Sequence, residues 1–142
     1  MQRSVQKRVL PLMVAVAVLG AVVGVGAATF LHPCRHADGS QAICAASGRA
    51  LTAAGLCIAL IALVGALVQN TRLRLCCAAL CALGGAILIL IPGTFCPLCL
   101  ASAMRCRTVT APSARVAGVL IVLLSLVQLA LCVRRILMEK KA

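Results

Sequence analysis

Residues 116–133 read VAGVLIVLLSLVQLALCV, eighteen consecutive residues without a charged side chain. Three similar runs precede this one, at residues 9–31, 50–68 and 75–91. A helix needs about 20 apolar residues, within a range of about 17–25, to cross the hydrocarbon core of a bilayer. In lipid the backbone must satisfy its hydrogen bonds within the protein, and a helix does so within one segment. The four runs therefore predict four transmembrane helices.

The composition of the whole chain agrees with this prediction. Of the 142 residues, 63% are hydrophobic and 11% are charged, whereas about a quarter of the residues of a soluble domain carry a charge. The mean hydropathy is +1.14. We therefore predict an all-α integral membrane protein, with residues 1–142 forming a single four-helix transmembrane bundle in the lipid bilayer.

The net charge of +12 is distributed in short clusters between the apolar runs. A nucleic-acid-binding domain would show a basic face with stacking aromatic side chains, so we predict no nucleic-acid partner. Nine lysines and arginines lie before the first run, between the second and third, or after the fourth, and five lie on the opposite side. By the positive-inside rule both termini are cytoplasmic, and the chain is a multi-pass protein of the inner (plasma) membrane.

The first run could also be a cleaved signal peptide, because basic residues precede it. Its 23 residues exceed the about 7–15 of a signal-peptide apolar region, so we expect an uncleaved span.

Five of the ten cysteines lie between the predicted spans, in two outer segments at residues 32–49 and 92–115. Thr29-Phe30 and Thr94-Phe95 precede these cysteines at an offset of 65 residues, and within each segment one cysteine follows another by ten. The pattern predicts two repeated helical hairpins, related by an axis along the membrane normal. The alternative is a chance match in a biased composition.

Glycines in the predicted spans indicate how the helices pack. Gly20 and Gly24 have the small-xxx-small spacing of close helix contacts, and Gly55, Gly65, Gly84 and Gly85 offer further points of approach. They predict a compact bundle, and dimerisation of two chains through Gly20 and Gly24 is the alternative use of that pair.

The outer cysteines have two interpretations. They face the oxidising side in this topology, where disulfides persist, so we expect Cys34 to pair with Cys44. Cys106 would pair with Cys96 or Cys99, and the ten-residue spacing favours Cys96 and leaves Cys99 free. The competing interpretation is a Cu or Zn site, because Cys, His and Met are ligands for such metals. Its candidate ligands are Cys96, Cys99, Met104, Cys106, His32 and His36.

A helix beginning at Pro97 would place Cys96, Cys99 and Cys106 on one face, but it would keep Cys96 and Cys106 too far apart to bond. The helix and the disulfide therefore exclude each other.

The predicted spans contain no acidic, basic or histidine side chain, which argues against a proton relay. Ser125 and Gln128 are the most polar residues of the fourth span, and we expect them to hydrogen-bond between helices. The cysteines within the membrane are expected to pack as small apolar side chains, with a sulfur path for Cu(I) as the alternative. They are Cys57, Cys76, Cys77, Cys81 and Cys132.

The four spans, the two outer cysteine segments and the motif Met104-Arg105-Cys106 resemble a bacterial membrane family, domain-of-unknown-function family 4418. In that family's pattern a cysteine follows each odd-numbered span, and a second cysteine comes a few residues later, after a methionine. Ile91-Pro92, which closes the third run, also fits. The first segment departs from the pattern, because Ala42 stands in place of the methionine and Ala45 in place of a histidine. This departure weakens the case for metal ligands in the first segment.

A second resemblance is to the four-helix disulfide-generating quinone reductases. Cys96-Pro97-Leu98-Cys99 has their Cys-x-x-Cys spacing, which can lower a thiol pKa, and Cys34 with Cys44 would be the partner pair. No residue pattern marks a quinone pocket.

Three functional hypotheses follow. The first is a non-enzymatic structural or transport-associated membrane component, partnered by other membrane proteins or by a second copy of itself. The second is a protein that binds or transports a soft metal, Cu or Zn. The third is a thiol–disulfide oxidoreductase that uses Cys96 and Cys99.

Overall fold

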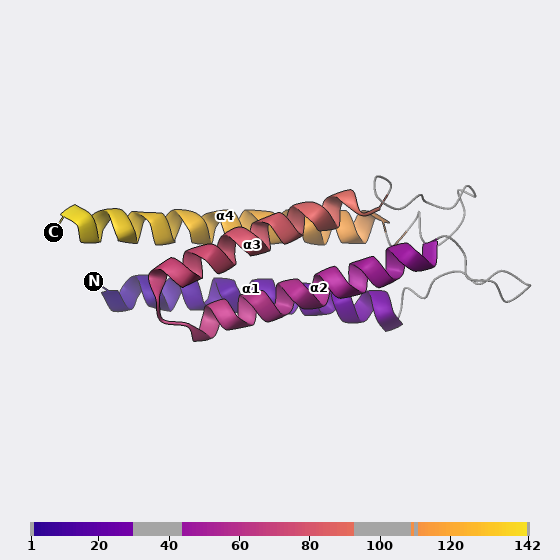
Figure 1. Ribbon diagram of the computed structural model, residues 1–142, viewed down its shortest axis with the longest axis horizontal. Coiled ribbons are helices and arrows are strands. Elements are labelled where there is room, and N and C mark those ends of the chain that lie inside the picture. The colour runs from indigo at the N-terminus through magenta and orange to yellow at the C-terminus, as the bar shows by residue number, and fades with distance from the viewer. Residues whose placement is uncertain (1, 30–43, 93–108, 110, 142) are drawn as a thin grey trace, which may run out of the picture.

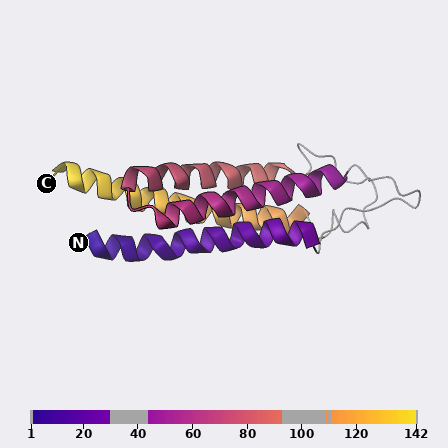
Figure 2. The same cartoon turned by 60° about the horizontal axis from the view of Figure 1, so that its bottom comes forward.

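The computed structural model describes residues 2–29, 44–92, 109 and 111–141. These form four helices: α1 (Gln2–Thr29), α2 (Cys44–Leu67), α3 (Thr71–Leu90) and α4 (Ala111–Lys141). The helices lie lengthwise beside one another in a single elongated bundle (Figures 1 and 2). The start of α1, the α2–α3 connection and the end of α4 lie at one end, which we call the terminal end (Figure 1). The other four helix termini lie at the opposite end, which we call the loop end.

Each helix contains a stretch long and apolar enough to cross a membrane: Val9–Thr29, Gly48–Leu67, Thr71–Leu90 and Ala111–Met138. Between 28% and 33% of the most apolar window of each helix is buried inside the bundle, so most of its apolar surface faces outward. Large apolar side chains such as Val22, Leu60 and Leu83 are each 62% exposed. Such an apolar exterior is suited to lipid. The predicted fold class, an all-α integral membrane bundle, is confirmed.

The four predicted runs fall on the four helices in order. At the terminal end α1 and α4 continue past the predicted runs, to Gln2 and Lys141. The charged residues there extend the helices beyond the apolar region. Residues 30 and 31 of the first run, and the greater part of the two outer segments, lie outside the described residues. Where the membrane boundaries lie along each helix stays a prediction.

Glycines bring the helices of each hairpin into backbone contact. A Cβ atom placed on Gly55 of α2 would lie 2.6 Å from the Gly24 nitrogen and 2.8 Å from the Gly20 oxygen on α1. In the second hairpin a Cβ atom on Gly118 of α4 would lie 2.8 Å from the Gly85 oxygen on α3. No side chain larger than hydrogen fits at these crossings without a shift of backbone. The Gly20–Gly24 face is therefore used within the chain and is covered by α2.

The two hairpins bury equivalent positions. Five of the six buried residues described in α1 are followed 65 positions later by a buried residue in α3 or just after its end, the same offset as the Thr-Phe match in the sequence. Five pairs follow this rule: Val9 and Arg74, Met13 and Ala78, Val16 and Cys81, Gly20 and Gly85, Ala27 and Pro92. Along α4 buried residues repeat those of α2 at an offset of 63: Leu51 and Ala114, Gly55 and Gly118, Ile58 and Ile121, Ala62 and Ser125, Gly65 and Gln128.

The contacts between hairpins follow the same symmetry, because α2 packs on α3 and α1 packs on α4. The burial pattern and the helix contacts are thus those of two similar hairpins packed side by side, as expected for parallel repeats.

Candidate functional site

The loop end is where the chain gathers its predicted site residues. The end of α1, both ends of the second outer segment and the start of α2 all lie there (Figure 1). The structure describes the backbone of Cys44, the first residue of α2. The other predicted site residues lie outside the described residues: His32, Cys34, His36, Cys96, Cys99, Met104 and Cys106. Their disulfides and metal contacts therefore stay predictions.

Hydrogen bonds fix the helix ends that carry the second outer segment. Arg115, in the first turns of α4, donates from Nη2 to the Pro92 carbonyl oxygen at 3.1 Å. Pro92 is buried and follows directly on the end of α3. The Ile91 amide donates to the Ile87 carbonyl at 2.9 Å, which continues the α3 hydrogen-bond pattern to its cap. The points where the chain leaves α3 and enters α4 are thereby held together.

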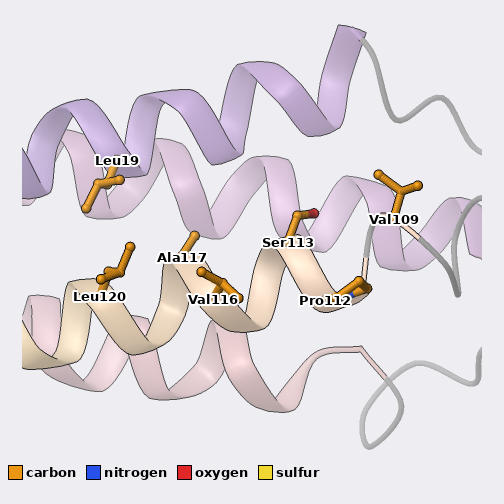
Figure 3. A pocket seen from close by; sticks show the side chains of 7 residues that line it. All are labelled: Leu19, Val109, Pro112, Ser113, Val116, Ala117 and Leu120. Atoms are coloured by element: carbon orange, nitrogen blue, oxygen red, sulfur yellow. The ribbon is translucent and has the colours of Figure 1, made fainter.

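A shallow apolar groove of about 490 Å³ lies between α1 and α4 near the loop end. Figure 3 shows Leu19 on α1 across from Ala117 and Leu120 on α4, with Val109, Pro112, Ser113 and Val116 completing the lining. Among the described lining residues, Ser113 is the one polar side chain and none is titratable. The chemistry of the described lining suits an acyl chain.

All five described cysteines in the spans are unpaired. Cys57 and Cys76 are exposed on the outer surface, whereas Cys77, Cys81 and Cys132 are buried. The Cys81 sulfur lies 4.0 Å from the Ile58 carbonyl oxygen, within a cluster of apolar core side chains. Within the described residues, no group of three or more His, Cys, Asp or Glu side chains could hold a metal ion.

A polar stripe runs along the buried face of α4, which we define as Ser125, Gln128, Cys132 and Arg135. The spacing of three, four and three residues places them on one side of the helix. Ser125 and Gln128 are both 0% exposed, and Cys132 is 3% exposed. Arg135 is half-buried at the terminal end.

Ser125 and Gln128 have no hydrogen-bond partner among the described residues. This holds for Oγ of Ser125 and for both Nε2 and Oε1 of Gln128. The prediction that they hydrogen-bond between helices is therefore wrong for the described part of the chain. Apart from Arg74 on α3, the described buried side chains of the other helices are apolar or sulfur-bearing, such as Met13, Ala62 and Cys81. An unsatisfied buried polar group costs about 1–3 kcal/mol, so these two side chains require an explanation.

Arg74 is buried at the terminal end although it carries a full charge. It is 4% exposed, and it donates from Nε to the Val68 carbonyl at 2.6 Å and from Nη2 to the Ala66 carbonyl at 3.3 Å. These carbonyls are at the C-terminus of α2, where the helix dipole is negative. Arg74 therefore caps α2 from the first turn of α3. Asn70, which accepts a hydrogen bond from the Arg72 amide at 3.1 Å, caps α3 in the same connection.

The chain matches the family model described as Domain of unknown function (DUF4418) over residues 16–131. The chain belongs to this family. The DUF4418 match covers both glycine crossings, both outer segments and Arg74, Ser125 and Gln128. The predicted resemblance to this family is confirmed. No curated protein and no solved structure matches the chain.

For this DUF4418 protein, sequence reasoning counted Arg74 only as a charge in the connection between spans. The signal that could have revealed its burial is its spacing from Ala78 and Cys81, at i+4 and i+7 on the inward face of α3. That spacing places a side chain on the same helix face as the two core residues. Sequence reasoning did single out Ser125 and Gln128, but it assigned them partners that the other helices do not supply.

Proposed function

We propose that this DUF4418 protein is a non-enzymatic membrane component, structural or associated with a transport complex, that presents two cysteine-bearing segments on one face of the membrane. The observation that carries the proposal is that the helix termini flanking both segments lie together at the loop end (Figure 1). Backbone contact at Gly20–Gly55 and at Gly85–Gly118 holds the two helices of each hairpin together, and these helices carry the two segments. The bundle below them offers no described catalytic group.

The distribution of charge supports an extracytoplasmic loop end. The terminal end carries Arg72, Arg134, Arg135 and Lys140, whereas Arg49 and Arg115 lie near the loop end. By the positive-inside rule the terminal end is cytoplasmic, in the plasma membrane of a bacterium. The outer cysteines then meet oxidising conditions, in which Cys34–Cys44 and Cys96–Cys106 disulfides would persist and would stabilise the segments by cross-linking them.

Soft-metal binding is the second candidate, supported by the gathering of helix ends. Because both segments start and finish at the loop end, His32 or His36 could share a Cu or Zn ion with Cys96, Cys99 or Cys106. The third candidate, thiol–disulfide exchange through Cys96 and Cys99, requires an electron acceptor such as a quinone. No described residue group forms a recognisable quinone site.

One purification separates the three candidates. The protein is extracted from membranes without reductant, and bound Cu and Zn are measured. The reduction of added quinone is then measured with a reduced dithiol peptide as the electron donor, because each quinone reduced takes two electrons from a dithiol that becomes a disulfide. The proposal expects no stoichiometric metal ion and no quinone reduction. A stoichiometric metal ion that is lost in Cys99→Ser would establish metal binding. Quinone reduction that is lost in Cys99→Ser would establish the oxidoreductase, with Cys57→Ser, on the lipid-facing surface, as the matched control.

A further inference from the structure

We propose that Ser125 and Gln128 form an intramembrane hydration site, which binds water inside the bundle and exchanges it with the terminal end past Cys132. The proposal rests on three unpartnered polar atoms on two fully buried side chains. It is independent of the proposed function, because it concerns the half of the bundle away from the loop end.

The pseudo-symmetry of the fold indicates that packing alone does not require these polar groups. The equivalent buried positions in the first hairpin are Ala62 for Ser125 and Gly65 for Gln128. That hairpin makes the same kind of crossing and the same buried face with small side chains that have no polar atoms. The second hairpin therefore carries polar side chains at two buried positions where the first hairpin carries Ala62 and Gly65. The first hairpin shows that the fold does not need a polar side chain at these positions.

The chemistry of the pair selects a neutral ligand that both donates and accepts hydrogen bonds. The Gln128 amide offers two donor hydrogens and one acceptor oxygen, and the Ser125 hydroxyl offers one donor and an acceptor. Residues three apart on a helix have Cβ atoms about 5–6 Å apart, a gap that one bridging molecule can span with hydrogen bonds of about 2.8 Å. Water is the smallest ligand with these properties, and buried waters typically make about three such bonds.

Charged ligands fit the site less well. The described residues show no metal-holding group, so a cation has no ligand set here. The buried cation Arg74 directs Nε and Nη2 to the carbonyls that end α2, and these satisfy part of its charge. Arg135, the other cation on this side, lies two turns from Gln128 at the terminal end.

The route of exchange follows the polar stripe. Cys132 lies one turn from Gln128 toward the terminal end, and half-buried Arg135 comes next on the same face. In the first hairpin, α2 ends at Leu67, also at the terminal end. Arg74 of α3 links the two hairpins there through its hydrogen bond to the Val68 carbonyl. Water that reaches Gln128 from the terminal end must pass Cys132, which makes this native thiol a reporter.

Thiol labelling tests the proposal on the native full-length chain. Membranes opened on both sides are treated with a small, permanently anionic methanethiosulfonate, which reacts with thiolates in water, does not enter lipid and is not repelled by Arg74 or Arg135. Tryptic peptides 50–72 and 116–134 each contain one cysteine, Cys57 and Cys132, so mass spectrometry reads both in the same sample. Cys57 lies on the lipid-facing surface and is the internal control. We expect Cys132 to react at least about tenfold faster than Cys57, because only a thiol in contact with water ionises readily.

The double variant Ser125→Ala/Gln128→Leu removes the hydrogen-bonding groups and should slow the Cys132 reaction by about tenfold. Leu126→Ala, on the lipid-facing side of the same turn, should leave the rate unchanged. If the double variant does not accumulate, Ser125→Ala alone should still lower the rate measurably. A Cys132 rate equal to that of Cys57 would overturn the proposal. So would a Cys132 rate that neither the double variant nor Ser125→Ala changes.

A high-resolution structure gives an independent readout. It should show ordered water within about 3.2 Å of Ser125 Oγ or of the Gln128 amide. A dry interior at both side chains would contradict the hydration site.

Discussion

Replacing Gly55 by alanine should loosen the first hairpin more than any other single methyl addition in α2. The new Cβ atom would lie 2.6 Å from the Gly24 nitrogen, 2.8 Å from the Gly20 oxygen and 2.8 Å from the Gly24 Cα. All three are backbone atoms of α1, so no flexible side chain can move aside. An ordinary contact begins at 3.4 Å, which leaves a deficit of 0.8 Å at the closest atom. The two helices must separate or tilt.

The expected magnitude follows from two opposing effects. Overpacking of a closely packed site typically costs about 1–3 kcal/mol. Alanine in place of glycine within a helix gains up to about 1 kcal/mol. Gly26→Ala in α1 is the matched control, because a Cβ atom there meets nothing within 4 Å. The difference in unfolding free energy between the two variants isolates the packing cost, which we expect to be about 1–3 kcal/mol.

Thermal unfolding of both variants in the same detergent, followed by circular dichroism, measures this difference. We expect Gly55→Ala to melt several degrees below Gly26→Ala, at about 2–8 °C per kcal/mol. Gly118→Ala should behave like Gly55→Ala, because its Cβ atom would lie 2.8 Å from the Gly85 oxygen. Equal melting temperatures for Gly55→Ala and Gly26→Ala would refute the argument that backbone contact at these glycines holds each hairpin together.

Three further predictions test other parts of the molecule. Arg74→Ala should lower the unfolding free energy by about 1.5–3 kcal/mol, because buried carbonyls of α2 lose a charged donor. The control Arg72→Ala, at an exposed position, should change it by less than about 0.5 kcal/mol. Equal effects of the two substitutions in chemical denaturation would contradict the capping of α2 by Arg74. Cys57→Ala, Cys76→Ala and Cys132→Ala should each cost no more than about 1 kcal/mol, because little volume is lost, and failure of any of these variants to accumulate in membranes would indicate a role beyond packing. Reporter fusions at Asn70 and at Ala142 should both read cytoplasmic, and an extracytoplasmic result at Ala142 alone would break the four-span topology.

The sequence was sufficient to predict the helices, because lipid leaves so few alternatives. A run such as 116–133 without a charge can satisfy its backbone in a bilayer only as a helix or in a closed barrel, and the length of the run favours the helix. The 65-residue offset seen at Thr29 and Thr94 also anticipated the repeated hairpin, which reappears in the buried positions of α1 and α3. Patterns that depend on one segment, or on a repeat of it, were therefore predictable.

Features that depend on the facing helix were not predictable in the same way. The spacing of Gly20 and Gly24 predicted a close helix contact. It could not show whether the partner was α2 of the same chain or a helix of a second copy of the protein. Hydrogen bonding of Gln128 depends on what the other three helices present at its depth, which no single span reveals. Arg74 looked like a loop charge because hydropathy takes no account of the free carbonyls at the end of α2.

The central proposal, that two cysteine-bearing segments on one face of the membrane are cross-linked by disulfides, is tested most directly by non-reducing peptide mapping. Free thiols are alkylated in intact membranes before tryptic digestion. The expected Cys34–Cys44 bond joins peptides 9–35 and 36–49, and the expected Cys96–Cys106 bond joins peptides 75–105 and 106–107. We expect both linked pairs to be recovered, with Cys99 alkylated. Alkylation of all five outer cysteines without prior reduction would contradict the account and favour metal binding, and a Cys96–Cys99 bond would contradict it in favour of redox chemistry.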